Sequence, residues 1–268
     1  MRPLVPSFPP GLRTVLRLGG SVLVVLALGA VWAARLRFIG DTYVSGLGSE
    51  GTAGAEVFNG ALGLIALGGA MVALGVGAAP RRGRGAWAVG YCLVAASAFF
   101  AVSAFVPCSS GCPLPLSADA EFRDLAHTAA AVTGFALTGI AILLTTRWSR
   151  AHARLALPSM AVVIVTSATG GLLSLAQVAT GLGGWLELIA TTAALIWLVA
   201  LALYTEVSIK GSAAAISAAS GTGGERTGMR ADTSENSRTF SPNFPPGLQE
   251  SSSTSVRTTS VSKLRGTP

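Results

Sequence analysis

Hydrophobic residues in this 268-residue chain are gathered into long blocks, and short polar connections separate the blocks. A helix rises about 1.5 Å per residue, so about 20 apolar residues are needed to cross a hydrocarbon core of about 30 Å. Six blocks reach this length. They predict transmembrane helices at about residues 15–34, 57–79, 86–106, 125–146, 155–179 and 186–204.

The blocks are apolar on all sides, which favours helices over barrel strands. Strands of a membrane barrel alternate in polarity, whereas a helix pairs every backbone group within its own segment. A signal peptide is the alternative for the first block, but its apolar run is longer than a signal sequence needs and no clean Ala-x-Ala site follows it. The sequence therefore predicts an all-α fold, a polytopic membrane helix bundle with six transmembrane helices.

Basic residues indicate which helix ends face the cytoplasm. Sixteen of the nineteen Lys and Arg residues lie near the N-terminus, in the second and fourth connections, or after Tyr204. The other three are Arg35, Arg37 and Arg123, in the first and third connections. Because short cytoplasmic connections collect positive charge, both termini are expected inside, an N-in/C-in topology. The same clusters account for the net charge of +7, so no nucleic-acid partner is expected.

Composition divides the chain into three parts. Residues 1–14 form a short cytoplasmic segment, and residues 15–207 form the transmembrane domain, which brings the charged content of the chain down to 12% against about 25% for soluble proteins. Residues 208–268 are dominated by Ser, Thr and Gly, and they predict a disordered cytoplasmic tail. Abundant Ala, Gly and Arg are typical of a GC-rich bacterial genome, which makes the bacterial plasma membrane the expected location.

Polar residues gather where the even-numbered helices start, on the predicted outer side. Glu56, Asp124 and Glu187 are expected at helix N-termini, where the helix dipole stabilises carboxylates, and that is their simplest explanation. The outer-face polar cluster predicted from the sequence consists of Tyr43, Ser45, Glu50, Glu56, Asn59 and Glu187.

His127 is the residue on this side best placed for chemistry. It lies about one turn inside the fourth predicted helix, and Asp124 precedes it by three residues, on the same helix face. Such a pair can orient an imidazole, transfer a proton or support a metal, so both residues are candidate catalytic groups. The alternative is a structural His at the interface, where partial hydration removes most of the cost of its polarity.

The three cysteines are of two kinds. Cys92 lies within the third predicted helix and resembles a small apolar residue. Cys108 and Cys112 lie in the third connection, on the oxidising side, and predict a structural disulfide closed by a turn that contains Gly111. A catalytic redox pair is an alternative, although the spacing is not Cys-x-x-Cys. A metal site that adds His127, and free thiols, are the remaining alternatives; no metal or cofactor is expected.

Several short motifs on the outer side resemble a known family. They are Tyr43-Val44-Ser45-Gly46-Leu47-Gly48, Phe58-Asn59-Gly60, Phe105-Val106-Pro107, Gly111-Cys112-Pro113 and His127. Together with six spans, they resemble the bacterial and archaeal membrane family known as domain of unknown function 998, over about residues 15–207. This resemblance implies a six-helix topology and no established activity. The family more often has an acidic residue at the position of Gly46, and Glu50 is the substitute available nearby.

Three kinds of function fit these features. No Walker loop, His-Glu-x-x-His or Gly-x-Ser-x-Gly motif is present, and no charge lies in the middle of a predicted span. We therefore expect a non-enzymatic membrane protein in contact with the bilayer, whose outer face or tail binds a protein or lipid partner. A small-solute transporter or permease is one alternative. The other is a membrane enzyme for redox or lipid chemistry that uses His127, Asp124, Cys108 and Cys112.

Overall fold

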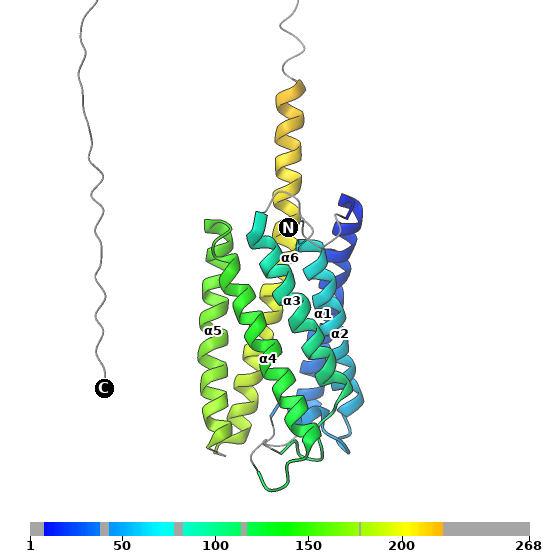
Figure 1. Cartoon of the computed structure of the whole chain (residues 1–268), viewed down its shortest axis with the longest axis vertical. Coiled ribbons are helices and arrows are strands. Elements are labelled where there is room, and N and C mark those ends of the chain that lie inside the picture. The colour runs from blue at the N-terminus through cyan, green and yellow to red at the C-terminus, as the bar shows by residue number, and fades with distance from the viewer. Residues whose placement is uncertain (1–7, 38–42, 78–82, 114–116, 177, 222–268) are drawn as a thin grey trace, which may run out of the picture. The chain divides into compact units, whose positions relative to one another are not determined.

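Six long helices make up the part of the chain that the computed structural model describes, which is residues 8–37, 43–77, 83–113, 117–176 and 178–221. Each contains a stretch long and apolar enough to cross a membrane, so the all-α prediction of a multi-pass integral membrane protein is confirmed (Figure 1). The elements in chain order are α1 (Pro10–Arg37), the short 3-10 helix η1 (Ser45–Gly48), α2 (Ala55–Gly77), α3 (Gly83–Phe105), α4 (Phe122–Thr145), α5 (Arg150–Leu175) and α6 (Thr180–Gly221).

Helices α1 to α4 pack one after another, α5 packs mainly on α6, and α6 returns to contact α1. The seam between α1 and α2 depends on glycine: a Cβ added to Gly68 would lie 2.8 Å from the carbonyl oxygen of Gly20. Small residues allow membrane helices to approach this closely and to gain van der Waals contact. Gly63, on the same helix, has no neighbour within 4 Å of such a Cβ, so only part of the glycine content of α2 serves close packing.

Apolar side chains from all six helices fill the core, and the largest fully buried ones include Trp197 and Leu201 of α6. Outward-facing positions are also apolar, as at Val165 and Leu172 of α5, which are 63% and 68% exposed. In water such a surface would drive aggregation, whereas lipid tails cover it at no cost. The exposed apolar surface thus agrees with contact between this bundle and a bilayer.

The six helices differ from the predicted spans by a few residues at most ends, and the two ends of α6 affect the interpretation. Helix α6 begins at Thr180, so Glu187 lies two turns inside it and not at its N-terminus as predicted. The helix also continues to Gly221, through residues 208–221 that were expected to begin the disordered tail. This stretch is rich in alanine, the residue with the strongest helix propensity. Residues 222–268, the rest of the predicted tail, lie outside the described residues, as do residues 1–7 of the predicted N-terminal segment.

One end of the bundle carries the features that concern function. Helices α1, α3 and α5 finish there, and α2, α4 and α6 start there, at the lower end in Figure 1. Helix η1 and the loop from Val106 to Pro113 cover this end. We call it the disulfide end.

Candidate functional site

A disulfide joins Cys108 and Cys112 in the loop that follows α3, as predicted. Their Cα atoms are 5.1 Å apart, and a backbone hydrogen bond of 2.9 Å from the N–H of Cys112 to the carbonyl of Ser109 closes the turn. Gly111 has a φ of 81°, in the left-handed region that costs a residue with a Cβ. Among the described residues, Cys92 is the cysteine with a free thiol, in the middle of α3.

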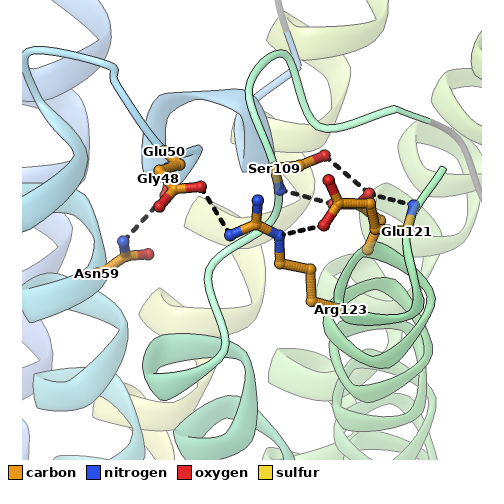
Figure 2. Close-up of polar contacts among 7 residues, drawn as sticks. Gly48, Glu50, Asn59, Ser109, Glu121 and Arg123 are labelled. Atoms are coloured by element: carbon orange, nitrogen blue, oxygen red, sulfur yellow. Dashed lines mark hydrogen bonds and ion pairs between the residues drawn. The ribbon is translucent and has the colours of Figure 1, made fainter. Parts of the chain in front are cut away.

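Asp124 fastens this loop to the start of α4. Its side chain is completely buried, and its Oδ1 accepts a hydrogen bond of 2.6 Å from the backbone N–H of Ser109. Its Oδ2 accepts two more, each of 2.8 Å, from the hydroxyl of Ser109 and from the backbone N–H of Glu121 (Figure 2). The last bond forms half of a capping box with Glu121, the N-cap residue of α4. Both oxygens of this carboxylate thus accept hydrogen bonds that hold the loop after α3 to the start of α4.

Further polar contacts hold the disulfide end together, and the ion pairs among them are exposed. Arg123 bridges Glu50, at 2.7 Å, and Glu121, at 2.9 Å, and thereby links the loop before α2 to the start of α4 (Figure 2). Asn59 donates a hydrogen bond of 2.9 Å to the carbonyl of Gly48 and so fixes η1 on α2. Glu56 is exposed in the first turn of α2, where the helix dipole accounts for it.

His127 is buried one turn farther along α4 than Asp124, yet the two side chains do not pair. The Nδ1 atom of His127 lies 3.0 Å from the carbonyl oxygen of Ser103 and 2.9 Å from that of Val106. Because both neighbours are acceptors, Nδ1 carries the hydrogen and the lone pair of the neutral ring is on Nε2. The predicted orientation of His127 by Asp124 is absent because Asp124 turns back to cap the helix, and the end of α3 orients the imidazole instead.

Glu187 projects from α6 toward the segment that precedes η1. Its Oε2 accepts a hydrogen bond of 2.8 Å from the backbone N–H of Val44. The ring of Tyr43 lies over Gly183 of α6, where an added Cβ would come within 3.0 Å of a ring carbon. The hydroxyl oxygen of Tyr43 is buried, and within the described part of the chain it has no hydrogen-bond partner.

Two neighbouring cavities border these residues. One, of about 80 Å³, extends between the helices from the disulfide end toward the middle of the bundle. Its wall includes Phe58, Ile65, Phe100, Gly69 and Leu198. The other, of about 340 Å³, lies between α4, α5 and α6 and has Tyr43, Cys112, Thr166 and Ser167 in its wall. The residues common to both walls are Ser45, His127, Ala131, Phe135 and Glu187.

The sequence of this chain matches the model of one protein family. The model of the family described as "Protein of unknown function (DUF998)" matches residues 18–204. The chain belongs to the DUF998 family. Comparisons with curated proteins and with solved structures give no match.

The DUF998 motifs of the sequence come together in space. The Tyr43–Gly48 segment, Asn59, the loop with both cysteines and His127 all lie at the disulfide end, although they are far apart in the sequence. Among the site residues predicted from the sequence, the structure separates two groups. Tyr43, Ser45, His127 and Glu187 line the cavities with Cys112, whereas Asp124, Glu50, Glu56 and Asn59 serve the cap and the surface.

The apolar part of the cavity wall was not predicted. Phe100 and Phe135 meet edge to face with ring centroids 5.5 Å apart, and Ala131 precedes Phe135 by one turn of α4. Within an apolar span such residues give no signal, because an identical side chain is equally suited to face lipid or core. Arg35 was expected only as a charge in a connection; it is buried near the end of α1, with its guanidinium 5.1 Å from the ring centre of Trp185.

Proposed function

We propose that this protein binds a lipid-like molecule in the two neighbouring cavities, with the polar end of the molecule at Glu187 and His127. The observation that carries the proposal is that the walls of both cavities include the ionisable side chains Glu187 and His127, whereas their other residues are mainly apolar with scattered Ser and Thr. A ligand pocket commonly has this form, with a hydrophobic lining and a small number of groups that fix orientation. The larger cavity, at about 340 Å³, is within the range of small-molecule sites.

The polar groups at the junction favour a ligand that donates hydrogen bonds. The carboxylate of Glu187 and the Nε2 atom of His127 are acceptors, and the hydroxyl groups of Ser45 and Tyr43 act as either donor or acceptor. A hydroxyl or amine is therefore a better match than a carboxylate, which would bring only acceptors to a site that already has the acceptors of Glu187 and His127. Farther from the disulfide end, Phe58, Ile65 and other apolar side chains provide a path for one hydrocarbon chain.

We further propose that the disulfide end faces the outside of a bacterial plasma membrane, with both termini in the cytoplasm. The distribution of Lys and Arg supports this orientation, since only three of the nineteen, Arg35, Arg37 and Arg123, lie in or beside the connections at the disulfide end. The disulfide supports it as well, because such bonds persist outside the cytoplasm. The ligand in this arrangement comes from the outer leaflet.

Photo-crosslinking tests the binding function. A monoacylglycerol analogue with a diazirine in its chain and an alkyne tag is added to membranes that contain the protein, and the crosslinked fraction per chain is measured. Ala131→Trp places an indole ring at the wall shared by the two cavities, where it occupies the space for the ligand. It should lower this fraction about tenfold, which corresponds to about 1.4 kcal/mol of binding free energy. A fatty-acid analogue with the same chain should crosslink less than the monoacylglycerol.

The matched control is Ala136→Trp, on an exposed position of α4 outside both cavity walls. It should crosslink as the wild type does, and both variants should elute at the wild-type volume in size-exclusion chromatography. Equal crosslinking of Ala131→Trp and wild type would contradict the proposal.

Movement of the same molecule across the bilayer is a second candidate function. The smaller cavity favours it, because its wall includes Gly69 and Thr191, close to the middle of α2 and of the apolar part of α6. In proteoliposomes, a transporter should speed the exchange of a fluorescent lipid between leaflets, and Ala131→Trp should abolish the effect. Intact crosslinking without such exchange would leave binding as the function.

A further inference from the structure

The two cysteines of the disulfide and the buried His127 form a compact group of potential metal ligands. The two sulfur atoms and a ring nitrogen of His127 all lie within 4.8 Å of one another, and all three residues are buried. Ligands around one tetrahedral zinc ion with thiolate bonds of about 2.3 Å are about 3.8 Å apart. After reduction the two sulfur atoms, which the disulfide holds about 2 Å apart, therefore need to separate by nearly 2 Å, and the nitrogen of His127 needs to approach them by no more than about 1 Å.

The tautomer of His127 is the one that a metal-binding histidine needs. A ligating imidazole almost always donates its other N–H to a carbonyl or carboxylate, which fixes the tautomer and aims the free nitrogen at the metal. In this structure the carbonyls of Ser103 and Val106 receive the Nδ1 hydrogen, at 3.0 and 2.9 Å, and Nε2 is left with its lone pair. This arrangement exists without any contribution from the cysteines, so it is an independent indication of a ligand.

We propose that reduction of the Cys108–Cys112 disulfide creates a binding site for one thiophilic divalent cation, with Zn²⁺ as the expected ion, held by Cys108, Cys112 and His127. An external dithiol supplies two electrons and two protons; the S–S bond breaks, two thiols form, and the dithiol becomes a disulfide. On binding, the ion displaces one proton from each thiol and takes the Nε2 lone pair. Two thiolates and an imidazole are the ligands that Zn²⁺ prefers.

The site has three protein ligands and one position left open. Cys112 and His127 both lie in the wall of the 340 Å³ cavity, so the fourth coordination position opens toward that space. Zinc sites that keep an open position bind water or a substrate there, in contrast to closed four-ligand sites. The metal site stands on the three ligands alone and does not depend on the proposed lipid ligand.

A Co²⁺ titration of the full-length protein in detergent tests this site. The protein is reduced with a phosphine under anaerobic conditions, because a dithiol in the solution would itself bind the metal. Reduced wild type should bind one Co²⁺ per chain with a thiolate-to-metal charge-transfer band and the visible spectrum of a tetrahedral ion. Oxidised wild type should show neither band, and added Zn²⁺ should displace the Co²⁺.

Two variants test the ligand set, and a third is the control. Cys112→Ser removes one thiolate, and His127→Asn keeps a donor near the Nδ1 position while it removes Nε2; each should weaken binding at least tenfold, since even a change beyond the ligands themselves has an effect on that order. Cys92→Ser removes the free thiol of α3, outside the cluster, and should leave the titration unchanged.

Three results would overturn the proposal. They are no charge-transfer band in the reduced wild type, equal Co²⁺ binding before and after reduction, and unchanged binding by a folded His127→Asn variant. The Ala131→Trp variant should bind Co²⁺ as the wild type does, so a failure of the lipid proposal and a failure of the metal proposal can be told apart.

Discussion

Two carboxylates at the disulfide end are surrounded in opposite ways. Asp124 is completely buried, and three protein groups donate to it at 2.6 to 2.8 Å. Glu187 lies at the junction of two cavities, where Oε2 accepts a hydrogen bond from Val44 and the carboxylate also borders open space. A carboxylate with a complete set of partners holds the fold together. One that borders a cavity is available to a ligand.

The largest loss of stability is expected from substitution of Asp124, whose carboxylate has a full set of hydrogen-bond donors around it. Asp124→Ala leaves the backbone N–H groups of Ser109 and Glu121 unpaired and should lower the free energy of unfolding by about 2–4 kcal/mol. Denaturant unfolding in detergent, followed by circular dichroism, measures this loss. Asp119→Ala, on an exposed position of the same connection, is the control and should have no effect. A stable Asp124→Ala variant would show that Asp124 does not anchor the loop.

The turn of the disulfide loop should show the next largest effect. Gly111 has a φ of 81°, so Gly111→Ala places a Cβ in the left-handed region and should cost about 1 kcal/mol of stability. Gly54→Ala is the matched control, because Gly54 lies in another loop with no positive φ and no atom within 4 Å of an added Cβ. Thermal unfolding compares the two variants. Equal melting temperatures would contradict the strain assigned to the turn.

Much of this fold follows from the sequence, because crossing a bilayer leaves few choices. About 20 apolar residues predict each helix, and the Cys-x-x-x-Cys spacing with Gly111 predicts the disulfide. The position of Glu187 was missed, since Gly181, Gly183 and Gly184 are typical of a connection. In the structure they are the first turns of α6, and the ring of Tyr43 lies over Gly183.

The relation between Asp124 and His127 shows a second limit of sequence spacing. Residues three apart on a helix are neighbours, and the pair was predicted on that ground. At a helix N-terminus the unpaired N–H groups also bind carboxylates, and in this protein Asp124 accepts from the N–H of Glu121 and does not pair with His127. The cavities were outside the reach of prediction altogether, because they depend on how the helices pack against one another, which no local pattern of apolar residues encodes.

Glu187→Gln should separate stability from binding. The amide oxygen of Gln keeps an acceptor for the N–H of Val44, so unfolding should change by less than about 1 kcal/mol. The change replaces one carboxyl oxygen by an NH2 group, and the loss of this acceptor should weaken crosslinking of the hydroxylated lipid analogue about fivefold. Crosslinking and unfolding are measured on one preparation. A large loss of stability with normal crosslinking would reverse the roles given to the two carboxylates.

The smallest effect is expected at the surface. Arg123 joins Glu50 and Glu121 through exposed ion pairs, and such pairs contribute little to stability. Arg123→Gln should leave the melting temperature unchanged at physiological salt. A clear decrease, absent at high salt, would show that these ion pairs take part in holding the loop that we assign to Asp124.

The central claim is that the junction of the two cavities, near Glu187 and His127, holds a lipid-like molecule. Peptide mass spectrometry of the wild-type protein after crosslinking with the diazirine monoacylglycerol analogue tests it directly, because the method locates the modified residues. The account predicts that the modifications concentrate on cavity residues of α4 and α6, such as Ala131, Phe135 and Leu195. Modification confined to outward-facing residues such as Val165 and Leu172 would contradict it, since that pattern reports only the surrounding bilayer.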